Sequence, residues 1–194
     1  MAERNRVTPY GQIVASPLRG AWMGNRGCIH RGREIVRQSA TRRWITCALS
    51  YKGWVAPKWT PNRWTALFFY DEAVALAAGH RPCALCRRAD YKRYMHAAQM
   101  PGADAADERL HAERLEAKQK RLHRLPWTEL PSGAFVEFGG EPHVVLPDAV
   151  MRWSETSGYV DTIVRPKRGD AVVITPLLSI EAIQRGYQPQ IAGL

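Results

Sequence analysis

The chain has 194 residues, a formal net charge of +10 and 45% hydrophobic residues. A chain of this length can bury a core of its own, which excludes the miniature domains that fold only around an ion. It has no run of about 18 apolar residues and its first ten residues carry charges and a proline, so we expect a soluble, cytoplasmic protein without a membrane partner.

The positive charge belongs to the first two thirds of the chain. Up to Leu125 there are 23 Lys and Arg against 10 Asp and Glu, whereas from Pro126 onward there are 5 against 8. Clustered cations gain affinity for nucleic acid by releasing its condensed counterions. We therefore predict a nucleic-acid partner for this part of the chain. The alternative is a basic, solvated surface that binds no such partner.

In the first half of the chain, residues 1–43 are rich in Gly, Pro and Arg and are expected to form loops. The β-branched and aromatic run over 43–51 predicts a strand. Residues 71–79 begin with two acids, continue with alanines and end in glycine, which predicts a short helix. A further helix is predicted over 87–99.

In the second half, Pro101-Gly102 marks a break. Residues 103–124 favour a helix, and the thin apolar stripe of Leu110 and Leu115 places it at the surface. The remaining expected elements are a hairpin over 134–146, a strand over 171–174, and a helix from Thr175 to about Gly186.

These elements predict an α+β fold with three parts. The first is a small basic zinc-binding unit over residues 1–100. A charged helix over 101–125 then connects it to a small β-rich unit over 126–194. The sequence does not specify an oligomeric state.

The strongest chemical motif is the pair Cys83 and Cys86 in Gly-His-Arg-Pro-Cys-Ala-Leu-Cys-Arg-Arg. Cys-x-x-Cys at a tight turn brings two sulfurs to one ion, and the free amides of the turn stabilise the thiolates. Cys28 and Cys47 would complete a four-sulfur zinc site, with His30 as an alternative to Cys28. The competing interpretations are a redox pair or four unrelated buried thiols.

Residues 68–87, Phe-Phe-Tyr-Asp-Glu-Ala-Val-Ala-Leu-Ala-Ala-Gly-His-Arg-Pro-Cys-Ala-Leu-Cys-Arg, resemble the second half of the Ada-type metal-binding domain of bacterial alkylation-repair proteins. That family has the same order of an aromatic strand, a short Glu-Ala helix, and Gly-x-Arg-Pro-Cys-x-x-Cys. The resemblance implies that Cys83 and Cys86 bind zinc in a domain that sits on DNA.

The first half of that family's pattern is altered here. Its leading cysteines are separated by three residues, and one of them accepts methyl groups from DNA phosphotriesters. This chain has no such pair, and Cys47 is the nearest substitute. Methyl transfer to a zinc-bound thiolate at Cys47 or Cys28 is therefore kept as an alternative function.

Cations and tryptophans alternate between residues 42 and 64, and cations continue after Cys86. Such a surface can hold phosphates while indole faces stack on unpaired bases. The predicted nucleic-acid-binding residues are Arg42, Arg43, Lys52, Lys58, Arg63, Arg87, Arg88 and Lys92.

Two further alternatives remain beside a binding function. His111 and Glu113, with Asp107 and Arg114 nearby, share a helix on which a histidine and a carboxylate could perform hydrolysis. A zinc-stabilised scaffold whose tryptophan-rich face contacts another protein is the third hypothesis. The preferred interpretation is a zinc-binding, nucleic-acid-binding protein rather than an enzyme.

Overall fold

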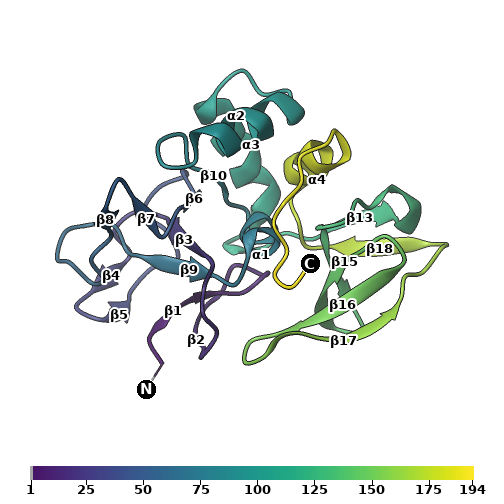
Figure 1. Ribbon diagram of the computed structural model, residues 1–194, viewed down its shortest axis with the longest axis horizontal. Coiled ribbons are helices and arrows are strands. Elements are labelled where there is room, and N and C mark those ends of the chain that lie inside the picture. Colours follow the sequence, from purple (N-terminus) through teal and green to yellow (C-terminus); the bar gives the residue numbers. More distant parts are fainter. Residues whose placement is uncertain (1) are drawn as a thin grey trace.

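The computed structural model describes residues 2–194, in which two six-stranded sheets lie on either side of a short central helix (Figure 1). The expected α+β class is confirmed. Within these residues no helix is both long and apolar enough to cross a membrane.

The N-terminal sheet is mixed. Its strand order is β10-β6-β3-β9-β1-β2, with β1 parallel to β9, β10 parallel to β6, and the other pairs antiparallel. The strands are β1 (Arg4–Val7), β2 (Ile13–Ala15), β3 (Trp22–Asn25), β6 (Ile45–Cys47), β9 (Leu67–Phe69) and β10 (Arg81–Pro82). Two separate hairpins join β4 (His30–Arg31) to β5 (Glu34–Ile35), and β7 (Ser50–Tyr51) to β8 (Trp54–Val55).

The prediction of loops throughout residues 1–43 was wrong, because β1 to β5 lie there. These strands have only two to four residues and are separated by glycines and prolines, so they leave no long alternation of polar and apolar side chains. The strand predicted over 43–51 is present, but it is divided into β6 and β7.

Helix α1 (Glu72–Ala77) is confirmed, with Asp71 at its N-cap accepting a 2.8 Å hydrogen bond from the Val74 amide. Gly79 follows it with φ of +89°, as expected for a helix-terminating glycine. Helix α2 (Arg88–Ala97) is also confirmed.

The third predicted helix is shorter than expected. Helix α3 (Ala103–Arg114) ends ten residues before 124 and is followed by a hairpin of β11 (Leu115–Glu116) and β12 (Gln119–Lys120). The buried Arg114 side chain donates to the carbonyl oxygens of Gly79 and Arg42 at 3.0 and 2.7 Å, which anchors the end of the helix.

The C-terminal sheet is antiparallel throughout, in the order β13-β18-β14-β15-β16-β17. The predicted hairpin and strand are confirmed. The elements are β13 (His123–Pro126), the 3₁₀ helix η1 (Trp127–Glu129), β14 (Phe135–Phe138), β15 (Glu141–Val145), β16 (Ala149–Ser154), β17 (Gly158–Val164), β18 (Asp170–Val173) and α4 (Leu177–Gln184). Helix α4 begins after Thr175, whose hydroxyl instead accepts a 2.8 Å hydrogen bond from the Phe135 amide.

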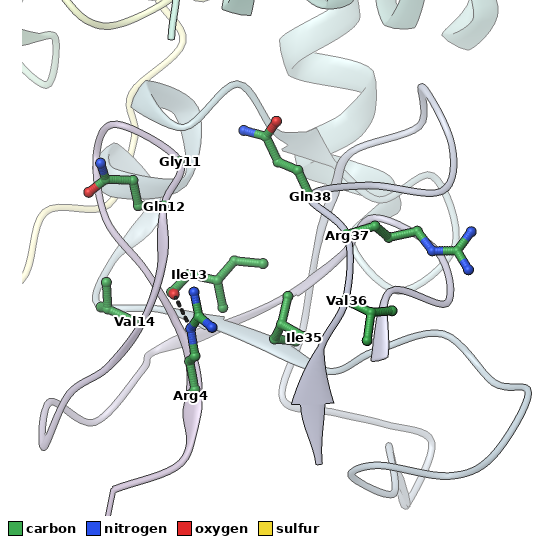
Figure 2. Close-up of a pocket in the computed structure, with 9 residues that line it drawn as sticks. All are labelled: Arg4, Gly11, Gln12, Ile13, Val14, Ile35, Val36, Arg37 and Gln38. Carbon is green, nitrogen blue, oxygen red and sulfur yellow. Dashed lines mark hydrogen bonds between the residues drawn. The ribbon is translucent and has the colours of Figure 1, made fainter. Parts of the chain in front are cut away.

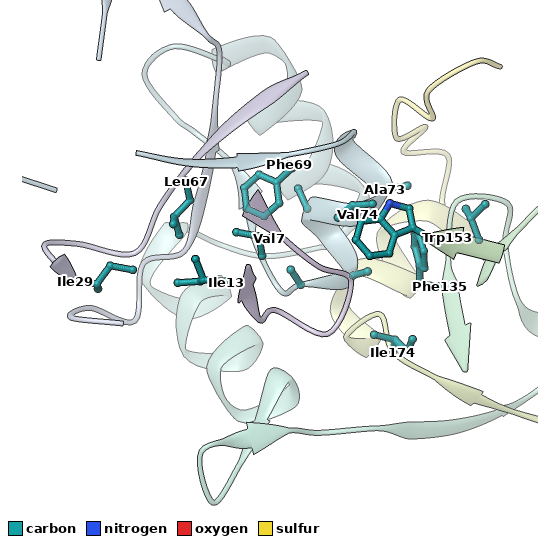
Figure 3. Packing of buried hydrophobic residues seen from close by; sticks show 14 residues of the cluster. Val7, Ile13, Ile29, Leu67, Phe69, Ala73, Val74, Phe135, Trp153 and Ile174 are labelled. Atoms are coloured by element: carbon teal, nitrogen blue, oxygen red, sulfur yellow. The ribbon is translucent and has the colours of Figure 1, made fainter. Parts of the chain in front are cut away.

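The two sheets share an apolar core around α1 (Figure 3). Val7 and Phe69 from the first sheet belong to the same buried cluster as Phe135 and Trp153 from the second. Beside it, the Tyr159 hydroxyl donates a 2.7 Å hydrogen bond to Asp71. The predicted units 1–100 and 126–194 therefore pack against one another through a continuous core.

Candidate metal centre

Strand pairing brings Cys47 and Cys83 together. In the parallel pair of β6 and β10, Thr46 lies beside Pro82, so the next residue of each segment is a cysteine. The Cys83 amide donates a 2.9 Å hydrogen bond to the Thr46 carbonyl oxygen and continues this register. Since paired positions of neighbouring strands place their side chains on the same face, the two thiols are adjacent.

The turn after β10 adds the third sulfur. The sulfur atoms of Cys47, Cys83 and Cys86 all lie within 4.8 Å of one another. Around one tetrahedral zinc ion, thiolate sulfurs are separated by about 3.8 Å, which follows from Zn–S bonds of about 2.3 Å. These three cysteines therefore form a donor set that fits one thiophilic metal ion.

Backbone amides stabilise negative charge on these sulfurs. The Leu85 amide donates to Cys83 Sγ and the Ala48 amide donates to Cys86 Sγ, each at 3.4 Å. Hydrogen bonds from its thiol to Cys83 and Cys86, followed by burial, raise the pKa of Cys47. The same contacts with Cys47 and Cys86 lower the pKa of Cys83. Metal binding requires the thiolate form, and the two amide hydrogen bonds favour that form at Cys83 and Cys86.

The structure does not bring Cys28 or His30 to this group. Cys28 is a half-buried free thiol in the turn after β3. Both ring nitrogens of His30 have other partners, Nδ1 with the Thr65 hydroxyl at 2.6 Å and Nε2 with the Thr60 carbonyl oxygen at 3.2 Å. Within residues 2–194, three of the predicted ligands meet and the fourth is separate.

A cavity of about 270 Å³ opens directly over the three cysteines. Its walls come from β3, β6, the turn between the two cysteines of the pair, and the hairpin of β7 and β8. In addition to the cysteines it is lined by Met23, Asn25, Ile45, Ala48, Tyr51, Trp54, Trp64 and Leu85. No acid, histidine, lysine or arginine lines it, so apart from the cysteine sulfurs its walls are uncharged and mostly apolar.

The hairpin of β7 and β8 supplies the aromatic wall. Its two-residue loop, Lys52 and Gly53, has φ of +51° and +78°, which is the type I′ geometry that fits a twisted hairpin. Tyr51 and Trp54 form a cross-strand pair, and both line the cavity. The sequence shows that tryptophans alternate with cations here, but it does not show that Trp54 and Trp64 line a cavity over the thiols.

Most of the predicted nucleic-acid-binding cations are exposed. Two of them have acidic partners, since Lys58 Nζ lies 2.8 Å from Glu3 and Arg43 lies 3.6 Å from Asp104. Arg87 differs, because its side chain is only 3% exposed and pairs with Glu72 and Asp90. The exposed members of the predicted set are Arg42, Arg43, Lys52, Lys58, Arg63, Arg88 and Lys92.

The residues considered for hydrolysis have structural partners. Asp107 accepts two hydrogen bonds from Arg81, at 2.9 and 2.7 Å, and does not orient His111. Glu113 accepts from Arg109 and from the Leu178 amide at the start of α4. The chain's candidate for chemistry is therefore the cysteine group rather than helix α3.

A second cavity, of about 520 Å³, lies beside β2 and β5 (Figure 2). On one side of it Arg4 donates a 3.0 Å hydrogen bond from Nε to the Ile13 carbonyl oxygen on the neighbouring strand. It is lined by no cysteine, histidine or acid, so it offers no nucleophile and no metal-binding set.

Comparison of the chain with protein-family models, curated proteins and solved structures gave no match. No family match supports the Ada-type likeness of residues 68–87, so the candidate metal centre rests on the geometry of the three cysteines.

Proposed function

We propose that this chain is a zinc-binding protein that binds nucleic acid on the surface next to its metal centre. The observation that carries the proposal is the convergence of three thiols from two segments 36 residues apart, Cys47 and the Cys83–Cys86 turn. Three thiolates prefer a soft or borderline ion, and zinc is the abundant ion that fits a tetrahedral sulfur site. The resemblance of residues 68–87 to an Ada-type zinc domain supports the same metal.

The nucleic-acid part of the proposal rests on what surrounds the centre. Trp54 is 53% exposed, although an indole of its size would normally be buried in a core. Lys52 precedes it in the hairpin loop, and Arg88 begins the helix that follows Cys86; both are exposed. An indole flanked by cations can stack on an unpaired base while the cations contact phosphates.

The test is binding of a fluorescent single-stranded oligonucleotide over a series of salt concentrations. We expect the logarithm of the association constant to fall linearly with the logarithm of salt concentration. Lys52→Gln should reduce the slope by about one unit, because one phosphate contact is lost. Lys167→Gln, at a matched exposed lysine in the loop between β17 and β18, should leave the slope unchanged.

Trp54→Ala tests the stacking contact. It should weaken binding about tenfold or more, since stacking on one base contributes about 1–3 kcal/mol. Phe138→Ala removes a partly exposed aromatic side chain from the C-terminal sheet and serves as its control. Binding that is independent of salt, or equal effects of the two substitutions, would contradict the proposed nucleic-acid surface.

A further inference from the structure

The cavity over the cysteine group raises the question of what completes the metal's coordination. A closed structural zinc site has four protein ligands, whereas a site with three protein ligands keeps one position for another molecule. All three cysteines line the cavity of about 270 Å³, and the group contains no fourth His, Cys, Asp or Glu within residues 2–194. A metal ion held by these three sulfurs would therefore be accessible to a fourth ligand from the cavity.

The cavity walls decide which kind of molecule fits. Met23, Ile45 and Leu85 offer aliphatic contacts, and the rings of Trp54 and Trp64, whose centroids are 6.3 Å apart, offer flat ones. The Asn25 amide oxygen already accepts a 2.7 Å hydrogen bond from the Gly27 amide. A ligand with an apolar or aromatic body is favoured here over a charged or sugar-like one.

The three protein thiolates determine which donor atom of the bound molecule is favoured at the metal. Three thiolates give a zinc site a net charge of about −1, which weakens it as an electrophile, and no histidine, carboxylate or lysine lines the cavity to act as a general base for water. A sulfur donor instead completes the four-sulfur coordination that structural zinc sites prefer. The preferred donor atom and the apolar walls together favour a ligand that has a thiol group and an apolar body.

We propose that this cavity binds a small thiol with an apolar, preferably aromatic, body, whose sulfur becomes the fourth ligand of the metal. The inference rests on the metal part of the proposed function. On binding, the S–H proton leaves to solvent and a metal–sulfur bond forms, with no change of oxidation state. The body of the ligand packs between Leu85 and the aromatic wall of the hairpin.

The exposed apolar surface at the cavity mouth agrees with a ligand of this kind. Leu85 and Trp54, which line the cavity, are 69% and 53% exposed, and Val55 beside Trp54 is 64% exposed. A bound apolar body would remove part of this surface from water, contributing about 25 cal/mol for each square ångström buried.

The experiment uses the full chain loaded with Co²⁺, whose absorption reports the number and type of its ligands. Benzyl mercaptan is titrated into the loaded protein, with benzyl alcohol as the matched oxygen compound. The thiol should change the d–d bands and raise the sulfur-to-metal charge-transfer absorption by about a third, as three thiolates become four. Benzyl alcohol should change neither.

Single substitutions distinguish the contribution of the cavity wall to thiol affinity from the contribution of the metal. Trp54→Ala should weaken benzyl mercaptan binding about tenfold while leaving the small polar thiol 2-mercaptoethanol within about threefold, because only the ring contact is lost. Phe138→Ala, far from the cavity on β14, should change neither affinity. Equal losses for both thiols would overturn the assigned role of the aromatic wall.

The outcomes also distinguish this inference from the proposed metal site. If Co²⁺ shows no thiolate charge-transfer bands, or if Cys83→Ser retains them in full, the metal site itself is wrong. If Co²⁺ binds but benzyl mercaptan leaves its spectrum unchanged, only the thiol inference fails. A ligand-free spectrum with four thiolates that drops to three in Cys28→Ser would show that Cys28 fills the position.

Discussion

The N-terminal and C-terminal regions of the protein differ in the number of charged side chains that they bury. The four buried arginines, Arg26, Arg81, Arg87 and Arg114, all lie in the first 114 residues, as do the buried acids Asp71, Glu72 and Asp107. The buried cluster on the C-terminal side includes Trp127, Val136, Val145, Val173 and Ile180, and no Arg, Asp or Glu after residue 114 is buried. Part of the positive charge of the first two thirds is therefore internal, and net charge alone overstates the basic surface.

Two of these buried cations contact the buried aromatic side chains Trp44 and His80. Two guanidinium groups pack on the Trp44 ring, with Cζ of Arg26 3.7 Å and Cζ of Arg114 4.1 Å from its centroid. Arg26 also donates a 3.1 Å hydrogen bond to His80. Burial, followed by the charges of Arg26 and Arg114, holds the pKa of His80 well below its usual value, so this histidine is neutral in the core.

The largest expected difference between the sheets comes from breaking a buried ion pair. Arg81 and Asp107 are each 4% exposed, and Asp107→Asn would leave the guanidinium buried without its charge partner. We expect the free energy of unfolding to fall by about 3–5 kcal/mol, measured by urea denaturation. A loss below about 1 kcal/mol would contradict the importance of this pair.

Lys120, on β12 beside the end of helix α1, gives the free energy of unfolding a pH dependence. Burial, followed by the charges of Arg26 and Arg114, lowers the pKa of Lys120 from 10.5 to about 7. Between these two values the unfolded chain holds a proton that the folded chain lacks, so the free energy of unfolding rises with pH, by up to about 1.4 kcal/mol per unit. Stability is lost as pH falls toward 7.

Lys120→Met should remove this rise. The native chain and the variant are compared by denaturation between pH 7 and 9, with Lys167→Met as the exposed control. Parallel stability curves for the native chain and Lys120→Met would show that Lys120 is not desolvated in the folded protein.

In the C-terminal core, Ile180→Val removes one methylene group from a position that is 2% exposed. The expected loss is about 0.5–1.5 kcal/mol, independent of pH, because only apolar packing changes. Thermal unfolding at two pH values measures both points. If the loss of unfolding free energy in Ile180→Val depended strongly on pH, it would contradict the proposed difference between the two regions.

The smallest effect is expected for an exposed ion pair of the C-terminal sheet. Arg152 contacts Asp161, whose side chain is 68% exposed. Asp161→Asn should cost about 1 kcal/mol or less and should matter less at high salt. A loss comparable to that of Asp107→Asn would remove the distinction between the two halves.

Elements with their own local signals could be predicted from the sequence. Asp71 and Gly79 delimit α1, and the two glycines at 139 and 140 mark the hairpin of β14 and β15. The strands of residues 1–43 could not be predicted, because they are very short and gain their stability from partners distant in the sequence. Arg6, for example, pairs with Phe68.

The candidate metal centre shows the same difference between local signals and long-range pairing, so only part of it could be predicted from the sequence. Cys83 and Cys86 are joined by a turn, so their spacing reveals them. Cys47 joins them through the parallel register of β6 and β10, which depends on long-range pairing. Cys28 and His30 were chosen by residue type alone, and their position is set by the loop after β3.

The most direct test of the account is the zinc content of the purified chain and of four single variants. We expect about one zinc per chain in the native protein and in Cys28→Ser. Cys47→Ser, Cys83→Ser and Cys86→Ser should each lose most of it. Full zinc occupancy in Cys83→Ser would contradict the central claim that Cys47, Cys83 and Cys86 together hold the metal.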